Sequence, residues 1–411
     1  MRRVLIFILL FVIIFTTPCV LHADEEKNSP VEFKVDFRSR YESKINFNFN
    51  RNKNDDTSYI GYSWKLGTLF RQKHTSEYIE LHYSKKGVNR MDSIELSQAY
   101  LNYNPTKSFN ARIGRQELNF GGKIMIASPP WSNIGRSYDA LKLGLRNKNF
   151  KAKVFGARVT KYHSDPDDPQ EYVYGLFTNT RISKLNSIDA YLFHRTKEEK
   201  GESKYQGVYA GGLRYHGKSN NFDYSLEGIT QFGKVGSKDQ RSYGYFINCG
   251  YRFPVKWKPR LGIQYNYASG DGNPYDDTIK TFDTFYGKKH PFCGYMDIVG
   301  MRNIKNTRLS LGFSPFRYFR GEIDYNFFTL ANSRDALYNL PGNKIFEDPT
   351  GAWGNDIGRE IDFTARYITG DFTLLSGCSK FYPGSAIKKI QGQADPASWV
   401  FTSLQYKFDF K

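Results

Sequence analysis

Apolar and polar residues alternate along most of this chain. Residues 31–41 show the pattern clearly, with one face formed by Val31, Phe33, Val35, Phe37 and Tyr41 and the other by Glu32, Lys34, Asp36, Arg38 and Arg40. The alternation returns in residues 60–70, 222–227, 243–252, 308–313, 319–327 and 400–410. A period of two predicts β-strands with one apolar and one polar face, and no helical period competes with it.

The number and spacing of these runs indicate a closed membrane barrel. About eighteen strands of ~10 residues can be counted, an even number as single-chain bacterial barrels require. With the amino terminus in the periplasm, links after even-numbered strands should be short and links after odd-numbered strands long. The short links are Gln72–Thr75, Asn104–Ser108, Asn147–Asn149, Lys218–Asn221, Ser314–Arg317 and Thr369–Asp371. The long links are Asn50–Ser58, Asn119–Gly135, Tyr162–Glu171, Thr196–Tyr205, Ser269–Lys305, Ala331–Gly358 and Tyr382–Ser398.

The composition supports the same architecture. Aromatic residues make up 17% of the chain, with 30 Tyr and 33 Phe, yet the mean hydropathy is −0.59. Barrel strands need apolar side chains only at alternate positions, so such a protein is hydrophilic on average although it crosses a membrane. We therefore predict an all-β, transmembrane antiparallel barrel. An exported β-helix or a carbohydrate-binding sandwich is the alternative, but no repeat of fixed period and no interdomain linker is visible.

The amino-terminal residues predict export. Arg2 and Arg3 precede the apolar run Val4–Phe15, and Ala23 stands before three acidic residues. This arrangement is typical of a secretory signal peptide, and the run is shorter than the ~20 residues of a spanning helix. We expect residues 1–23 to be the signal peptide and 24–411 the outer-membrane barrel. A lipoprotein is disfavoured because Thr17 and Pro18, not small residues, precede Cys19.

The distribution of charged residues indicates which kind of solute the lumen would favour. The chain has a formal net charge of +18, and loss of Arg2 and Arg3 leaves +16. Alternation places more basic than acidic side chains on the polar face, which predicts a lumen that concentrates anions, while interspersed carboxylates keep a polyanion from sticking. Alternatively, the basic residues neutralise acids of the wall or contact lipopolysaccharide phosphates. The remaining cysteines, Cys249, Cys293 and Cys378, form no disulfide framework.

Three blocks of sequence resemble the alginate export porin family. The first comprises residues 114–118, Gly121, 131–133 and 135–139; the second, residues 267–273, 281–283, His290, Gly294, Asp297 and 302–303; the third, residues 360–364 and 381–384. The resemblance implies an eighteen-stranded outer-membrane channel for an anionic polysaccharide, with external loops folded into the pore.

Alternation and resemblance together give the candidate pore-lining residues. They are Arg38, Lys65, Arg112, Arg115, Gln116, Arg136, Asp139, Lys142, Lys153, Arg260, Arg308, Arg320, Asp362 and Arg366. Parity puts Arg115 and Asp139 on the outward face unless a bulge intervenes, so their alternative role is to pin a loop. The third external link, Asn119–Gly135, either folds into the lumen, with Trp131 against the wall and Arg136 facing the pore, or is an ordinary outward loop.

Other functions are less well supported. Seven histidines lack a flanking nucleophile motif, so we expect no enzyme and no cofactor. Asp271–Asp277 lacks the ligand spacing of a calcium loop, and we expect no metal. Basic residues are spread among strands, which argues against nucleic acid. The expected partners are outer-membrane lipid, lipopolysaccharide, an acidic polysaccharide or small acid, and a periplasmic export scaffold for a monomeric barrel. A general uptake porin for small organic acids or sugars and a non-conducting structural barrel are the alternatives.

Overall fold

A computed structural model describes residues 30–86, 93–160, 170–198 and 205–410 of the chain. The expected signal peptide, residues 1–23, lies outside the described residues. Among those described, no helix is long and apolar enough to cross a membrane.

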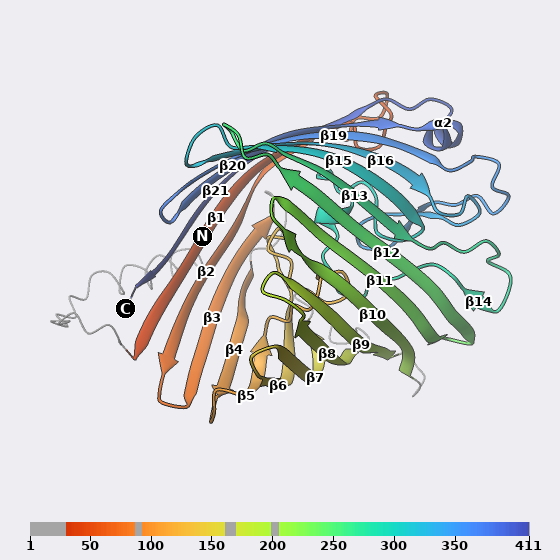
Figure 1. The fold of residues 1–411 in the computed structure, drawn as a ribbon. Helices are drawn as coiled ribbons and strands as arrows, with labels where there is room; N and C mark the ends of the chain where they lie inside the picture. Colours follow the sequence, from red (N-terminus) through yellow and green to blue (C-terminus); the bar gives the residue numbers. More distant parts are fainter. Residues whose placement is uncertain (1–29, 87–92, 161–169, 199–204, 411) are drawn as a thin grey trace.

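Eighteen antiparallel strands of the described chain close into one barrel (Figure 1). Each strand pairs with its neighbours in the chain, and the last strand pairs with the first from Phe33–Phe410 to Ile45–Ser398. The predicted fold is therefore confirmed. The barrel strands are β1 (Val31–Ile45), β2 (Thr57–Arg71), β3 (Thr75–Lys86), β4 (Ser93–Tyr103), β5 (Phe109–Gln116), β6 (Ser137–Arg146), β7 (Phe150–Thr160), β8 (Glu171–Arg181), β9 (Asn186–Glu198), β10 (Tyr205–Ser219), β11 (Phe222–Val235), β12 (Lys238–Arg252), β13 (Arg260–Ala268), β15 (Ile304–Phe313), β16 (Phe319–Leu330), β19 (Asp356–Thr369), β20 (Phe372–Pro383) and β21 (Ala397–Phe410).

Small elements occur in the long links. They are β14 (Thr278–Ile279), the 3-10 turn η1 (His290–Phe292), β17 (Leu337–Tyr338), β18 (Lys344–Phe346) and the helix α2 (Ser385–Gln391). β14 adds two residues to the edge of β12 in parallel, and β17 pairs with β18 in a separate hairpin. None of them contributes to barrel closure.

The predicted alternation of short and long links holds with two exceptions. The link 253–259 follows an even-numbered strand but has seven residues, more than the link after β3. The link between β11 and β12 should be a long external loop, but it is the two-residue turn 236–237. Gly236 has a φ of +59°, a backbone conformation that glycine adopts without strain. Charged and polar residues run through this hairpin, so the sequence pattern shows no break between the strands.

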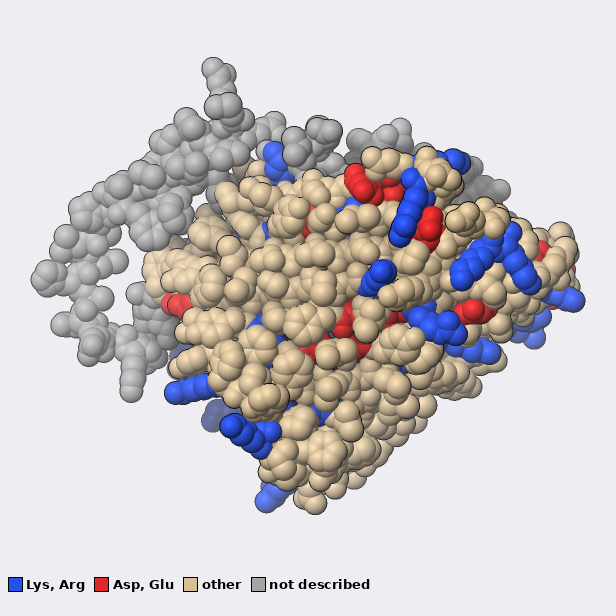
Figure 2. Space-filling view, turned by 90° about the horizontal axis from the view of Figure 1, so that it is seen from above, with Lys and Arg blue, Asp and Glu red and all other residues tan. Residues whose placement is uncertain are grey.

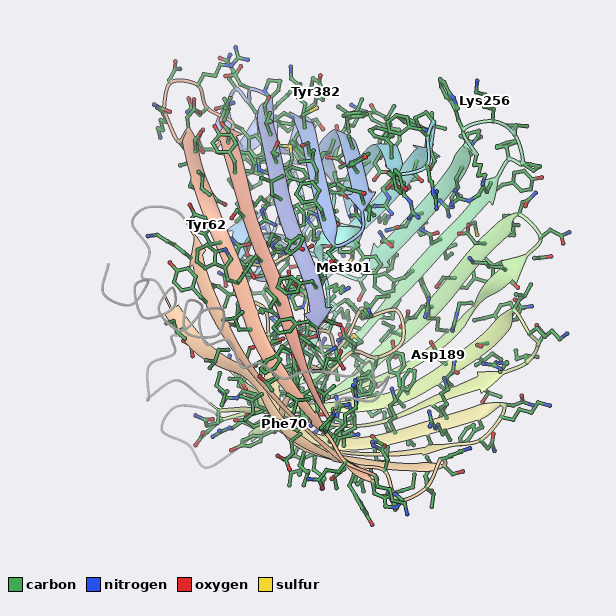
Figure 3. All side chains as sticks on the ribbon, turned by 90° about the vertical axis from the view of Figure 1, so that its left-hand side faces the viewer. Tyr62, Phe70, Asp189, Lys256, Met301 and Tyr382 are labelled. Carbon is green, nitrogen blue, oxygen red and sulfur yellow. The ribbon has the colours of Figure 1, made fainter. Side chains whose placement is uncertain are left out.

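The two faces of the wall differ as the alternation predicts. Outward apolar side chains such as Leu145 and Leu213 are 58% and 60% exposed, whereas the inward Arg40 is only 5% exposed. Phe70 and Tyr382 point away from the lumen, and Figure 3 shows many side chains crowding the interior. Seen from the side drawn in Figure 2, most of the surface is uncharged, with charged side chains mainly toward the right of the view and at its lower left. An apolar outer band matches the bilayer interior.

Loop 117–136, which follows β5, folds into the lumen. Its Phe120 stacks on Phe155 of β7 with ring centroids 4.7 Å apart, and it also contacts Phe177 and Phe193. A glycine on β8, Gly175, makes room for this aromatic cluster because a Cβ there would collide with Phe193. Of the two alternatives for this third external link, the structure shows the one in which it enters the lumen.

The first prediction concerns this aromatic anchor. Replacing Phe120 by Ala should cost about 3 kcal/mol or more, because a buried ring is removed from a packed site. An anchor weakened by that amount should raise the released fraction of the loop about a hundredfold. Limited trypsin digestion of the purified protein, followed by mass spectrometry, measures cleavage after Lys123 in this loop.

Ile134→Ala provides the control, since Ile134 lies in the same loop but is 36% exposed. Its cleavage rate should match that of the wild type. Equal rates for Phe120→Ala and Ile134→Ala would show that the aromatic cluster does not hold the loop.

Candidate functional site

A second loop, 269–303, joins the first inside the barrel. The two loops meet in a parallel bridge between Ile126 and Tyr286, with Ala127 N donating to Tyr286 O at 3.2 Å and Tyr286 N to Met125 O at 3.0 Å. Buried backbone groups need such partners because water does not reach them. The paired loops therefore form one unit, called here the plug, which consists of residues 117–136 and 269–303.

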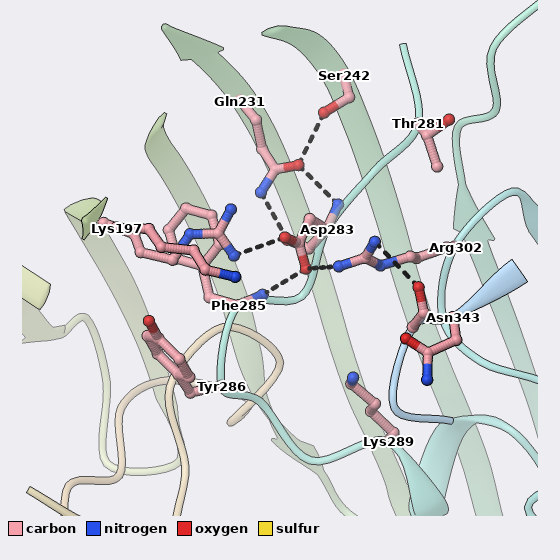
Figure 4. A network of polar contacts seen from close by, with 12 residues as sticks. Lys197, Gln231, Ser242, Thr281, Asp283, Phe285, Tyr286, Lys289, Arg302 and Asn343 are labelled. Carbon is pink, nitrogen blue, oxygen red and sulfur yellow. Dashed lines mark hydrogen bonds and ion pairs between the residues drawn. The ribbon is translucent and has the colours of Figure 1, made fainter. Parts of the chain in front are cut away.

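An ion-pair network fixes the plug to the wall (Figure 4). Asp283 of the plug accepts from Arg195 of β9 at 2.6 Å and pairs with Arg302 at 2.8 Å. Gln231 of β11 brackets the backbone of Asp283, accepting from its N–H at 2.9 Å and donating to its carbonyl at 2.6 Å. Burial opposes ionisation, but the two guanidinium groups hold the pKa of Asp283 well below its usual range.

Further around the wall, polar side chains of β13, β15 and β19 hold the turn η1 and the residues that follow it. Asn306 of β15 and Asn266 of β13 donate to the carbonyl of Phe292 at 2.9 and 3.1 Å. Glu360 of β19 accepts from the N–H of Met296 at 3.0 Å. The plug is thus anchored to a series of wall strands, from β9 to β19, by groups that satisfy its backbone.

Beside the plug lies a cavity of about 1020 Å³. Its lining combines wall and plug residues, among them Arg38, Trp131, Arg136, Lys288, Lys289, His290, Arg366 and Lys407. A second cavity of about 410 Å³ shares Arg38, Lys288 and Lys407 with the first. The first cavity extends from Thr373 beside a short link to Thr160 and Glu171 beside a long external link, so it reaches both ends of the wall. Lys34 and Asp409 place the second cavity near the periplasmic end.

Aromatic stacking shapes the first cavity. Trp131 of the plug stacks on His290 with ring centroids 4.4 Å apart, and Arg40 of β1 lies 4.2 Å from the Trp131 ring centroid. The edge of Trp131 meets Phe401 of β21. Trp131 therefore joins the two halves of the plug to the wall, as expected.

Lys289 is the plug lysine that burial affects most clearly. Its Nζ donates to the carbonyl of Leu340 at 2.7 Å. Burial lowers the pKa of Lys289 to about 8; nearby Asp283 raises it, whereas Arg302 and Arg136 lower it further. The ammonium group is therefore protonated at neutral pH and loses its proton in mildly alkaline solution.

Most of the candidate lining residues lie on the inner face of the wall. They are Arg38, Lys65, Arg112, Gln116, Lys142, Lys153, Arg260, Arg308, Arg320, Asp362 and Arg366. Several hold structure together. Arg38 donates to the carbonyls of Pro130 and Ser132 in the plug, and Arg260 pairs with Asp223 at 2.6 Å. Arg136 lies on the plug and donates to the carbonyl of Tyr286 at 2.6 Å.

Some inner-face residues support the plug or the wall next to it. Arg308 donates to the carbonyl of Pro291, and Asp362 accepts from Asn326 at 3.0 Å. Gln116 is fully buried and donates to the carbonyl of Ala140 at 3.0 Å. These three are fixed by their partners and present little free charge to a solute.

Arg115 and Asp139 are not brought into the lumen. They pair across β5 and β6 at 2.7 Å, and Arg158 of β7 joins Asp139 at 2.8 Å, all on the face that carries Leu141. A bulge in β4 leaves the carbonyl of Leu96 to accept from Arg115 at 3.1 Å. The expectation that these two line the pore is corrected: they tie three strands together from outside.

Reading the sequence did not identify the ion pairs of the plug. Arg195 and Asp283 are 88 positions apart, and their pairing depends on the path of a long loop. Asp283, His290 and Arg302 belong to the blocks that resemble a known family, and this was the available signal. Among the described residues, no group of three or more His, Cys, Asp or Glu side chains is arranged to hold a metal ion.

Solved structures of similar fold are outer-membrane porins. OccAB4 of Acinetobacter baumannii is similar with a TM-score of 0.61 and 10% identity, over 93% of this chain and 99% of that chain. The outer membrane protein OpdK from Pseudomonas aeruginosa is similar with a TM-score of 0.64 and 9% identity, over 92% and 99%. A second OpdK structure, with vanillate, gives 0.63 and 10% over the same shares. At such identities the likeness shows the fold alone.

Sequence comparison identifies the family. No curated protein matches the chain. A family model described as alginate export matches residues 29–401, which is nearly the whole predicted mature chain. Together with the eighteen-stranded barrel and its porin neighbours, this match places the protein in a Gram-negative outer membrane. The chain belongs to the alginate export family of outer-membrane channels.

Proposed function

We propose that this channel passes anionic solutes through a basic lumen, and that its principal substrate is an acidic polysaccharide such as alginate. The observation that carries the proposal is a cluster of three basic side chains on the inner wall, Arg112, Lys142 and Lys153, which has no carboxylate partner in the described part of the chain. We call these three residues the basic cluster.

The register of the strands brings the basic cluster together. Arg112 of β5 lies directly opposite Lys142 of β6. Lys153 of β7 lies opposite Gly144 of β6, two residues along the strand from Lys142. The guanidinium carbon of Arg112 lies 4.0 Å from the Tyr100 ring centroid, and the Lys153 Nζ lies 5.7 Å from that of Phe120. Like charges held together without an acid create a positive potential that favours anions.

A further basic pair supports the same preference. Arg320 of β16 and Arg366 of β19 are opposite each other in the register, and Arg366 lines the larger cavity. Neither has an ion pair to a carboxylate among the described residues. A guanidinium group matches a carboxylate in a bidentate way, which suits uronate residues.

The plug bears on the size of the solute. The plug lies inside the barrel, where aromatic and backbone contacts hold it. A polysaccharide therefore passes only when the plug moves. We infer that its two loops separate to open the passage, because only a few backbone hydrogen bonds around the Ile126–Tyr286 bridge join them. A periplasmic scaffold that delivers polymer, and a monomeric working state, belong to this proposal.

The second candidate is an uptake porin for small organic acids. A cavity of about 1020 Å³ has the size of a small-molecule site. OpdK, whose fold is similar, was solved with vanillate. Both candidates are channels, and we propose no enzymatic activity.

The second prediction tests anion preference. In liposome-swelling assays, replacing Lys142 and Lys153 together by Gln should lower the uptake of glucuronate relative to glucose by about threefold to tenfold, because the attracting charges are gone. Lys148→Gln, in the exposed turn 147–149, should leave the ratio unchanged. An unchanged ratio in the double variant would refute a role for the basic cluster.

The third prediction concerns pH. Because Lys289 has a pKa of about 8, it is cationic below that pH and neutral above it. Anion selectivity in planar bilayers should therefore fall between about pH 7 and about pH 9. Lys289→Arg should remove the fall because arginine stays charged, and Lys289→Gln should show low selectivity throughout. A wild-type pH profile that persists in Lys289→Gln would assign the titration to another group.

The fourth prediction separates the two candidate substrates. A disulfide formed in the double variant Ile126→Cys/Tyr286→Cys should lock the plug, since these residues bridge its two loops. The oxidised protein should still admit glucuronate but stop an alginate oligomer, and reductant should restore passage of the oligomer. Oligomer transport that continues in the oxidised protein would contradict passage by movement between the two loops.

A further inference from the structure

The outer wall formed by β13, β15, β16, β19, β20 and β21 has an unusual charge distribution. At its outward positions these strands carry no Asp or Glu within the described residues. They do carry Lys305, Arg359 and Lys380. The wall therefore has positive charge without compensation from acids of its own.

All three basic residues lie next to long external links. Lys305 is the second residue of β15, Arg359 lies near the start of β19, and Lys380 lies near the end of β20. Lys305 is opposite Thr329 in the register, Arg359 is opposite Phe327, and Lys380 is opposite Ile361. The three side chains thus lie on β15, β19 and β20 at the external end of the wall, with β16 between the first two strands.

Tyrosine rings accompany the two lysines. The Nζ of Lys305 lies 6.0 Å from the ring centroid of Tyr267, and that of Lys380 lies 5.4 Å from the centroid of Tyr382. Tyrosine is enriched where the apolar band of a barrel meets the headgroups. Their ring contacts therefore locate both ammonium groups at headgroup level.

Three other outward basic residues near the external end have acidic partners. Arg115 and Arg158 share Asp139, and Arg241 contacts Asp239 at 3.4 Å. By contrast, neither Lys305, Arg359 nor Lys380 has a hydrogen bond or ion pair to a carboxylate among the described residues. Uncompensated cations at headgroup level bind anionic lipid headgroups.

We propose that Lys305, Arg359 and Lys380 bind the phosphate groups of lipopolysaccharide in the outer leaflet. Arg359 offers a planar fork for one phosphate, while the two lysines contribute point charges on either side. The site lies on the outside of the barrel, so it does not depend on what the lumen transports.

The fifth prediction tests this site on the full-length barrel in detergent. The triple variant Lys305→Gln/Arg359→Gln/Lys380→Gln should bind purified lipopolysaccharide about tenfold more weakly than the wild type, because each basic group contributes to headgroup attraction. Arg241→Gln is the matched control, since Arg241 is outward and exposed but faces Asp239; its affinity should stay near that of the wild type.

Two further measurements complete the test. The shift in gel mobility on heating should be the same for all variants, which shows that the barrels are closed. Lipopolysaccharide that lacks its lipid A phosphates should bind the wild type and the triple variant equally weakly. Inorganic phosphate at millimolar concentration should not displace intact lipopolysaccharide, since a lipid site needs both the phosphate and the acyl chains of its ligand. Unchanged affinity in the triple variant, an equal loss in Arg241→Gln, or full displacement by inorganic phosphate would overturn the proposal.

Discussion

Backbone hydrogen bonding in a medium without water is the constraint on which this structure depends. Every N–H and C=O group within the bilayer must find a partner in the protein, and an open sheet leaves two edges unpaired. Pairing of β1 with β21 removes both edges. Once the sheet is closed, each strand must direct one face to lipid and the other to the lumen, and this produces the alternation seen along the chain.

Closure with eighteen strands creates a second problem, because side chains of the wall alone do not fill so wide a lumen. The protein fills it with the plug, whose Phe120 packs among aromatic side chains and whose Asp283 lies between Arg195 and Arg302. Removing one partner of an ion pair buried in this way destabilises a protein, because the remaining charge is left without a partner. The plug is thus attached to particular strands, and two cavities lie beside it.

The sequence predicted those features that repeat locally. Period-two alternation located the start of β1 at Val31 and the end of β21 at Phe410, although both strands extend three or four residues further at their other ends, and the strand count was correct. The tight turn at Gly236 escaped detection because its flanking residues carry no sign of a short link. Similarly, parity warned that Arg115 and Asp139 face outward, but the family resemblance favoured the lumen. The Arg195–Asp283 pair was not predictable, since it joins a strand to the middle of a long loop, and no local pattern encodes the path of that loop.

The central claim is that the lumen prefers anions, and the reversal potential of the wild-type protein in a planar bilayer tests it most directly. Under a potassium chloride gradient, the account predicts discrete conductance steps with a reversal potential displaced toward the chloride equilibrium potential. A displacement toward the potassium equilibrium potential, or a bilayer that stays silent after insertion of closed barrels, would contradict it.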